Sequence, residues 1–197
     1  MYALKQNDSA ANRVAGFVCK HVFFAHENII TSIALLSDKI IVSAGWDKRL
    51  HFWNLETYTF IGALDSSGKV NDSNPSDWVF VADAEILSIE YVPSIKQFAI
   101  SSVDNFVYVR SWEEKTENGN TYYYSFLVAA LKHNYEVSFV RHITSINQWV
   151  TAGQDDYIRF WSTQSISENN QTLNKTVCRI FYNTLLFSYT VIKVFLE

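Results

Sequence analysis

The stretch SAGWDKRLHFWN, residues 43–54, contains two tryptophans separated by a short polar turn. Trp46 directly precedes Asp47, and Trp53 follows that aspartate by six residues. Apolar and β-branched residues lead into the turn and out of it, which predicts two short strands joined by a tight connection. A repeat of the stretch elsewhere in the chain would show which tryptophan belongs to the structural pattern.

The pattern returns in TAGQDDYIRFWS, residues 151–162, with the same six-residue step from aspartate to tryptophan. A histidine stands about twenty residues before each aspartate, and a serine or threonine stands four residues before it. The shared positions are His26, Ser43, Asp47 and Trp53 in the first unit, and His133, Thr151, Asp155 and Trp161 in the second. Trp53 is therefore the structural tryptophan, and Trp46 stands opposite Gln154.

A weaker copy lies between the two units, in residues 82–112. Asp104 is in phase with the aspartates, but Ala82 stands where the histidine is expected. Trp112 follows the aspartate by eight residues instead of six, and Arg110 occupies the tryptophan position. We predict that this copy has a broken set of side chains, with only Asp104 and a displaced Trp112. We also expect this unit to be less rigid or to have a bulged turn.

The composition favours strands. Hydrophobic residues make up 48% of the 197 residues and aromatic residues 16%, with 6 glycines and 2 prolines. Such a chain has the composition of a globular protein rich in β-formers. The aspartates are 57 and 51 residues apart, and without the polar loops between units the period is about 40–45 residues, typical of a four-stranded propeller blade.

The two complete sets resemble the WD-repeat β-propeller family. The resemblance implies an all-β fold of four-stranded antiparallel blades, with about three to four blades present as a partial or incomplete propeller. It also implies a hydrogen-bonded tetrad in each blade, in which the turn aspartate holds the histidine, the histidine meets the hydroxyl, and the indole N–H completes the chain. Buried polar side chains need such partners.

The organisation expected from the repeats has seven parts. They are an N-terminal leader (1–16), a first repeat (17–64), a polar loop (65–77), a degenerate second repeat (78–112), a charged loop (113–120), a third repeat (121–162) and a tail (163–197) that is a partial fourth blade or a divergent extension. Further strands are expected at 17–24, 58–64, 121–131 and 177–181. The tail resembles the outer strand of one blade followed by the first strand of the next.

The number of units leaves three interpretations open, because propellers have four to eight blades. The chain is a fragment of a longer propeller, which we favour, or it completes a ring with another chain or a second copy, or the tail closes a small ring. An end blade without a neighbour exposes apolar side chains and strand edges.

The net charge, the terminal segments and the cysteine count limit the partners and the compartment that we expect for this protein. The formal net charge is −4, and no basic cluster is longer than Lys48-Arg49, so we expect no direct contact with nucleic acid. The first residues have no apolar segment typical of a signal peptide, and no apolar run is long enough to span a membrane. With only Cys19 and Cys178, these features predict a reducing compartment, cytoplasmic or nuclear.

The sequence offers little support for a catalytic, cofactor-binding or metal-binding site. No phosphate loop, zinc-protease helix or nucleophile elbow is present, and we expect no cofactor. Cys19, His21 and His26 suggest a metal site, but without a paired cysteine we expect none. The serine, histidine and aspartate of the tetrads are expected in a structural network, not a catalytic triad. His51 and His142 alternate with apolar residues and are expected on blade surfaces.

The resemblance implies a non-enzymatic scaffold, a rigid platform for other proteins in a multiprotein complex. In this family the residue before the turn aspartate faces partners, which makes Trp46, Val103 and Gln154 the candidate partner-binding residues. An exposed tryptophan is a favoured interface anchor, although packing of Trp46 against the adjoining blade is an equally good interpretation. Two further functions stay open, a non-catalytic subunit that supports an RNA-modifying or RNA-processing enzyme and a propeller hydrolase.

Overall fold

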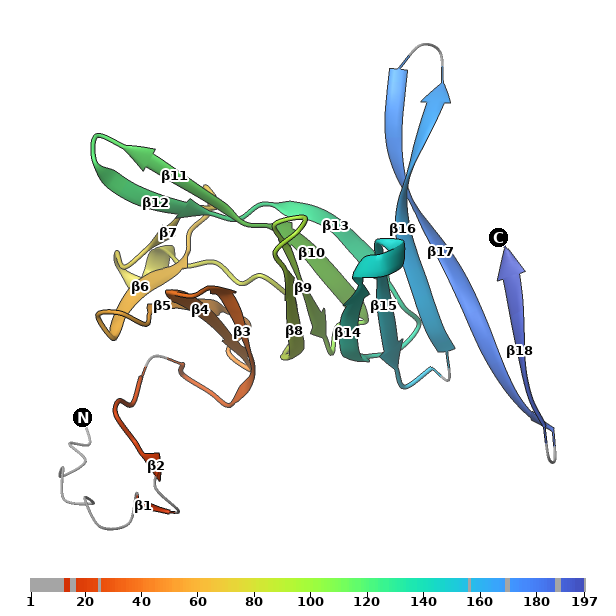
Figure 1. Cartoon of the computed structure of the whole chain (residues 1–197), viewed down its shortest axis with the longest axis horizontal. Helices are drawn as coiled ribbons and strands as arrows, with labels where there is room; N and C mark the ends of the chain where they lie inside the picture. The colour runs from red at the N-terminus through yellow and green to blue at the C-terminus, as the bar shows by residue number, and fades with distance from the viewer. Residues whose placement is uncertain are drawn as a thin grey trace.

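The computed structural model describes residues 13–14, 17–24, 26–155, 157–168, 171–186 and 189–196, with side chains for 19–24, 26–155 and 157–162. These residues form antiparallel strands and two single-turn 3-10 helices, which confirms the all-β class. Three large sheets, called blades 1 to 3 below, lie side by side in chain order without closing into a ring (Figure 1). The fold is a partial propeller.

Blade 1 has five strands in the order in which they occur along the chain. They are β3 (Ile30–Ser37), β4 (Ile40–Gly45), β5 (Leu50–Asn54), β6 (Thr59–Leu64) and β7 (Val70–Asn71). Residues 65–77, expected as a polar loop, therefore contain β7 and also the 3-10 helix η1 (Pro75–Asp77). The side chain of Asp65 organises this segment by accepting hydrogen bonds from the backbone of Ser67 and Lys69 and from the side chain of Asn71.

Blade 2 has four strands, and its outermost strand is supplied after an insertion. The strands are β8 (Ile86–Val92), β9 (Gln97–Ser102), β10 (Phe106–Ser111) and β13 (Leu127–Lys132). The pairing of β10 with β13 shifts register between Val109 and Arg110, at the outer edge of the blade and away from its aspartate turn. Blade 1 has a comparable shift between Phe52 and Trp53, so this irregularity is not the bulged turn expected for blade 2.

A separate hairpin is inserted between β10 and β13, formed by β11 (Glu113–Glu117) and β12 (Asn120–Tyr124). The prediction of a charged loop over 113–120 was therefore wrong. Asn118 and Gly119 both have positive φ and make the two-residue turn that such a pair favours between strands. The hairpin lies over the outer end of blade 1, where Lys69 contacts the ring of Tyr122 (Figure 1).

Blade 3 has five strands in chain order. They are β14 (Val137–Ile143), β15 (Gln148–Gly153), β16 (Tyr157–Glu168), β17 (Gln171–Leu186) and β18 (Tyr189–Leu196), with the 3-10 helix η2 (Thr144–Ile146) between the first two. The tail therefore pairs as the fourth and fifth strands of this sheet, and β18 does not begin a new blade.

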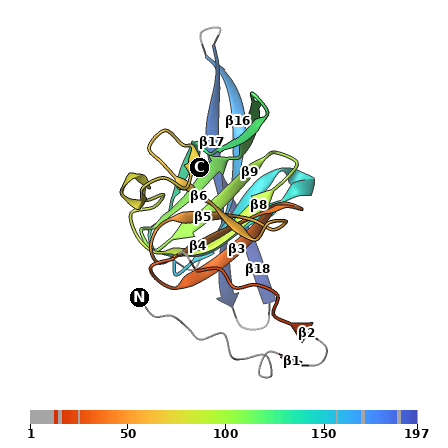
Figure 2. The ribbon, with the colours of Figure 1, turned by 90° about the vertical axis from the view of Figure 1, so that its left-hand side faces the viewer.

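The segment before blade 1 is mostly not a strand. The described part has a short pair, β1 (Arg13–Val14) with β2 (Phe17–Val18), and residues 19–24 follow without strand pairing. The expected strand at 17–24 is therefore wrong beyond Val18. Phe23 instead packs on the ring of Trp53, and His21 stacks on Tyr58. Figure 2, with blade 1 towards the viewer, shows this segment running along the lower side.

The core consists of two apolar clusters, one between blades 1 and 2 and one between blades 2 and 3. Strand β9 serves both, because Phe98 and Ile100 face blade 1 while Ala99 faces blade 3. Ile33 in β3 pairs with Ser43 as Ile89 in β8 pairs with Ile100, yet Ile33 is 64% exposed and Ile89 only 3%. The tetrad face of each blade thus faces the preceding blade, and in blade 1 this face is partly open.

Candidate functional site: the tetrads and the aspartate turns

In blade 1 the four tetrad side chains lie in one hydrogen-bonded chain. His26 Nδ1 is 2.8 Å from Asp47 Oδ2, and its Nε2 is 2.7 Å from Ser43 Oγ. The indole Nε1–H of Trp53 donates to the same hydroxyl at 2.9 Å. With the carboxylate accepting, His26 carries its proton on Nδ1, and its Nε2 accepts the hydroxyl proton of Ser43.

The turn between β4 and β5 holds the aspartate in place. Backbone amides of Glu27 and Arg49 donate to the carboxylate of Asp47 at 3.3 Å each. Burial raises the pKa of the Asp47 carboxyl, but the hydrogen bonds from His26 and from the amide of Arg49 lower it by more, so the net pKa lies below its usual value. Asp47 therefore stays ionised inside the turn.

His51 is the largest departure from expectation in blade 1. It was expected on the blade surface, but it is 1% exposed, and its ring stacks on that of His26 with centroids 4.0 Å apart. Among the described residues neither ring nitrogen has a hydrogen-bond partner. Burial, followed by the neighbouring His26, lowers the pKa of His51 to about 4, so the ring is neutral near pH 7. His51 is buried because the rings of Phe60 and Trp78 pack around it.

His26, Asp47 and His51 place one potential metal-ligand atom each within 4.8 Å of one another. Both nitrogens of His26 are already hydrogen-bonded, and the two imidazole planes are only 18° apart. Stacked rings direct their in-plane lone pairs side by side and not to one point, so the geometry disfavours a metal centre. The other set considered, with Cys19 and His21, lies on an exposed segment where the thiol faces the His21 carbonyl.

In blade 3 the structure also brings the four tetrad residues together, but a fifth residue alters their connections. Nε2 of His133 is 2.8 Å from Thr151 Oγ1, and the indole of Trp161 donates to that hydroxyl at 2.8 Å. Asp155, however, lies 3.6 Å from His133, beyond a hydrogen bond. Arg159 comes between them.

Arg159 Nη1 is 2.8 Å from His133 Nδ1 and 2.5 Å from Asp155 Oδ2. Because a guanidinium only donates, His133 Nδ1 must accept and its proton must lie on Nε2. The pKa of His133 is lowered to about 4, first by burial and then by the charge of Arg159. His26 and His133, equivalent in sequence, are thus opposite tautomers.

Blade 2 has no tetrad, and the predicted partial set of Asp104 and Trp112 is wrong in one member. Asp104 holds its turn, accepting from the backbone of Asp83 at 2.8 Å and from the hydroxyl of Tyr108 at 2.9 Å. Trp112 lies beyond the end of β10, where its ring stacks between Phe52 and Tyr123. It is part of the interface between blades 1 and 2.

Arg110, at the tryptophan position, bonds to Ser125. Ile100 stands at the hydroxyl position of the tetrads, so blade 2 presents an apolar side chain there to the core. With neither hydroxyl nor indole available, the set is broken in blade 2 for a chemical reason.

One position that the sequence analysis missed is shared by all three blades. The residue four after the turn aspartate, opposite the hydroxyl position in the sheet, reaches that aspartate each time. His51 Nε2 lies 3.8 Å from Asp47, Tyr108 donates to Asp104, and Arg159 is paired with Asp155. The signal was present as a polar residue inside each apolar strand.

A family comparison agrees with this geometry. Residues 17–54, which include the first tetrad, match the family model of the WD domain, G-beta repeat. This segment is a WD40 repeat. A search of curated proteins finds no match to the chain. The part of the chain that the structure describes also contains no helix long and apolar enough to cross a membrane.

In the WD40 repeat, the residue before the turn aspartate has equivalents in the other blades. The backbone amides of Trp46, Val103 and Gln154 donate to the carbonyls of Ile29, Glu85 and Glu136, so the three turns share this hydrogen bond. Gln154 also bonds through its side chain to that of Glu136. Trp46 is 40% exposed, and no aromatic ring of the described residues contacts it.

Other exposed side chains surround this turn of the WD40 repeat. Ile29 is 54% exposed, and Phe80 is 63% exposed, with Lys48 and Arg49 at 5.9 and 5.1 Å from its ring centre. Lys48 also donates to a backbone carbonyl of the segment before blade 2, and Arg49 pairs with Glu27. The turn thus combines apolar and cationic groups, the composition of a protein-binding surface.

Proposed function

We propose that the protein is a non-enzymatic interaction scaffold that holds a partner protein through the aspartate-turn end of blade 1, with Trp46 as the anchor. WD40 repeats are generally non-catalytic protein-binding modules. The single observation that carries the proposal is the 40% exposure of Trp46, a large aromatic side chain that stands where the third blade has a glutamine. Tryptophan buries much area at small entropic cost and is enriched among binding hot spots.

The surroundings support a partner of defined chemistry. Ile29 and Phe80 extend the apolar area, and Lys48 places positive charge next to it, while Arg49 is already paired with Glu27. A partner segment with an apolar residue next to a carboxylate fits this surface, because opposite charges at the rim favour association. Lys48 and Arg49 are too few cations to grip a nucleic-acid backbone, because that affinity depends on clustered Lys and Arg side chains.

The hydrolase alternative has a geometric basis but no accessible nucleophile. Ser43, His26 and Asp47 have the connectivity of a Ser-His-Asp triad, with distances of 2.7 and 2.8 Å. Ser43 is only 4% exposed, and its hydroxyl already accepts from the indole of Trp53. A nucleophile must approach a substrate atom, so this arrangement supports a structural role.

The test is the Trp46→Ala variant of the full chain. We expect its urea unfolding midpoint to change little, because an exposed side chain contributes about 0.5 kcal/mol or less to stability. We expect capture of the partner, measured by quantitative pull-down and mass spectrometry, to fall at least about tenfold. Phe139→Ala removes another exposed aromatic ring, 61% exposed in blade 3, and is the matched control that should capture the partner normally. Unfolding of Trp46→Ala, or unchanged capture, would assign Trp46 to packing and refute the proposal.

A further inference from the structure

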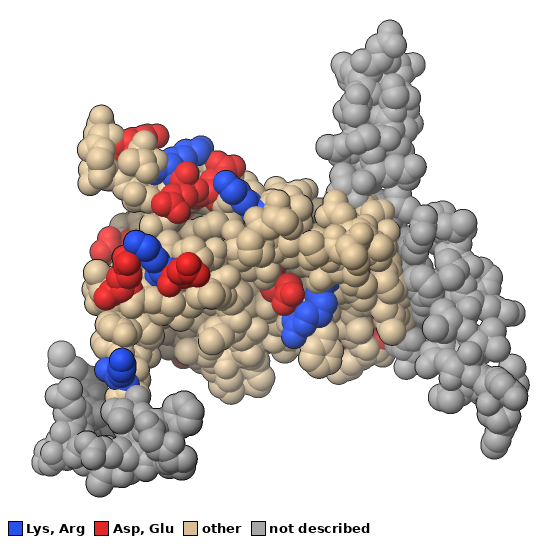
Figure 3. All heavy atoms as spheres, in the orientation of Figure 1, with Lys and Arg blue, Asp and Glu red and all other residues tan. Residues whose placement is uncertain are grey.

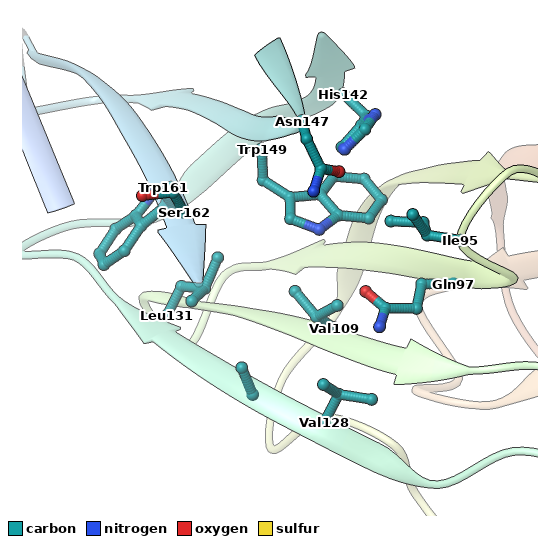
Figure 4. A pocket seen from close by; sticks show the side chains of 11 residues that line it. Ile95, Gln97, Val109, Val128, Leu131, His142, Asn147, Trp149, Trp161 and Ser162 are labelled. Carbon is teal, nitrogen blue, oxygen red and sulfur yellow. The ribbon is translucent and has the colours of Figure 1, made fainter. Parts of the chain in front are cut away.

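A cavity of about 120 Å³ opens between blades 2 and 3 at the end of the blades opposite the aspartate turns. Its floor is apolar, formed by Val109 of β10, by Ala129 and Leu131 of β13, and by Trp161. Polar side chains stand around it, among them Gln97, His142 and Asn147 (Figure 4). The connection between β14 and β15, which includes η2, forms one wall.

A donor without an acceptor points into this cavity. Trp149 is 8% exposed, and Figure 4 shows its indole nitrogen turned towards Val109 and Gln97. The indoles of Trp53 and Trp161 donate to hydroxyls, but no described residue accepts a hydrogen bond from Trp149. The indole N–H is open to solvent in the cavity, so a ligand carbonyl can replace water as its acceptor and fix the orientation of the ligand.

The size of the cavity limits what enters it. A cavity of about 150 Å³ holds benzene, so a volume of about 120 Å³ suits one branched aliphatic side chain. Its floor offers apolar atoms to that side chain, while the indole N–H can donate to a carbonyl oxygen close by. A leucine or isoleucine within a peptide supplies both groups from one residue.

The neighbouring strand shows how such a peptide is held. Strand β13 is the edge of blade 2, and within the described ranges no strand pairs with its outer side. An extended peptide added to that edge projects alternate side chains onto the face that carries Ala129 and Leu131, which line the cavity. The surface around it is apolar, with Leu127, Val128 and Ile146 each about half exposed.

The charges of the surface agree with an uncharged ligand. In Figure 3 the Lys, Arg, Asp and Glu side chains of this face gather mainly over blade 1 and the β11–β12 hairpin, with few over blades 2 and 3. None of the residues that line the cavity is a Lys, Arg, Asp or Glu. We infer that the cavity and the edge of β13 form a binding site for an extended, uncharged peptide segment that inserts one leucine or isoleucine side chain and accepts a hydrogen bond from Trp149.

The test uses the ¹⁵N-labelled full chain and follows the indole N–H resonance of Trp149, assigned by its loss in Trp149→Phe. The probe is an acetylated heptapeptide of alternating threonine and valine with a central leucine, added to about 5 mM to reach Kd values near 1 mM. We expect a saturable shift of this resonance. The peptide with a central aspartate should bind at least about tenfold more weakly, since its side chain loses the apolar burial.

Two variants locate the binding. Ala129→Leu fills the cavity and should remove the shift, and Val128→Arg at the exposed mouth should do the same if the first variant unfolds. Trp46→Ala, at the opposite end of the blades, should bind the peptide normally, which separates this site from the proposed partner surface. The inference is overturned if the leucine peptide gives no shift, if the aspartate peptide binds equally well, or if N-acetyl-leucine methylamide alone binds as tightly as the heptapeptide.

Discussion

Blades 1 and 3 both have side chains at the four tetrad positions, but the hydrogen bond between histidine and hydroxyl runs in opposite directions in the two blades. In blade 1 the carboxylate of Asp47 contacts the histidine directly, and the hydroxyl donates to it. In blade 3 the guanidinium of Arg159 separates Asp155 from His133 and turns the histidine into a donor towards Thr151. The difference shows that the fifth residue, four after the aspartate, decides the polarity of the network.

The comparison predicts unequal costs for the same substitution. Asp155→Asn leaves the buried guanidinium of Arg159 without its anion, and we expect a loss of about 3–5 kcal/mol in the free energy of unfolding. Asp47→Asn keeps a neutral hydrogen bond to His26 and should lose only about 1–2 kcal/mol. Urea unfolding of both variants followed by tryptophan fluorescence measures the difference. Equal losses would contradict the role given to Arg159.

Acid should weaken both blades, because the pKa values of His51 and His133 are lowered to about 4 in the folded state. Unfolded histidines titrate near pH 6.5, so between about pH 6.5 and 4 the unfolded chain binds more protons and stability falls as pH falls. Within that window each histidine contributes a slope of at most about 1.4 kcal/mol per pH unit. Above about pH 6.5 the contribution is complete. Unfolding midpoints at pH 7, 6 and 5 measure the slope, and a flat profile would show that these rings are solvated.

His51→Phe tests the partnerless histidine of blade 1. The substitution removes two buried nitrogens without acceptors or donors and keeps an aromatic ring against Phe60 and Trp78, so we expect a gain of about 1 kcal/mol at pH 7. The acid slope should also fall by about half. The matched change His133→Phe breaks the blade 3 network and should destabilise the protein. A destabilised His51→Phe variant would mean that His51 has a polar role.

The smallest effect is the position of one proton on each tetrad histidine of the wild-type protein. Two-dimensional ¹⁵N–¹H spectra of histidine side chains should show His26 protonated on Nδ1 and His133 protonated on Nε2. Arg159→Met should move His133 towards the tautomer of His26, because Nδ1 then no longer accepts from a guanidinium. Identical tautomers in the wild-type protein would contradict the connections described for blade 3.

Much of the architecture could be predicted from the sequence, because the spacing of a turn is local. The six-residue step from Asp47 to Trp53 and its repeat from Asp155 to Trp161 predicted strands joined by a turn, and those strands are present. The hairpin turn at Asn118-Gly119 had an equally local signal, which a reading of residues 113–120 by charge alone passed over. The local sequence was thus sufficient to predict these turns.

The side-chain environments depended on contacts between distant segments. Alternation with apolar residues suggested that His51 lies on the surface, but the rings of His26 and Trp78 pack against it. Trp112 resembled a displaced tetrad residue in the sequence, but the neighbouring blade supplies Phe52 for it to stack on. No spacing along one chain segment encodes which face another segment will cover.

The sequence by itself determined the strand-turn-strand units and which residues could share hydrogen bonds, because turn geometry and polar pairing act over a few residues. Only the tertiary structure decided which of those bonds form, that Arg159 enters one tetrad, and that Trp46 stays exposed while Trp149 lines a cavity. These outcomes depend on how one blade packs against the next, and burial sets both the protonation of a histidine and the accessibility of a tryptophan.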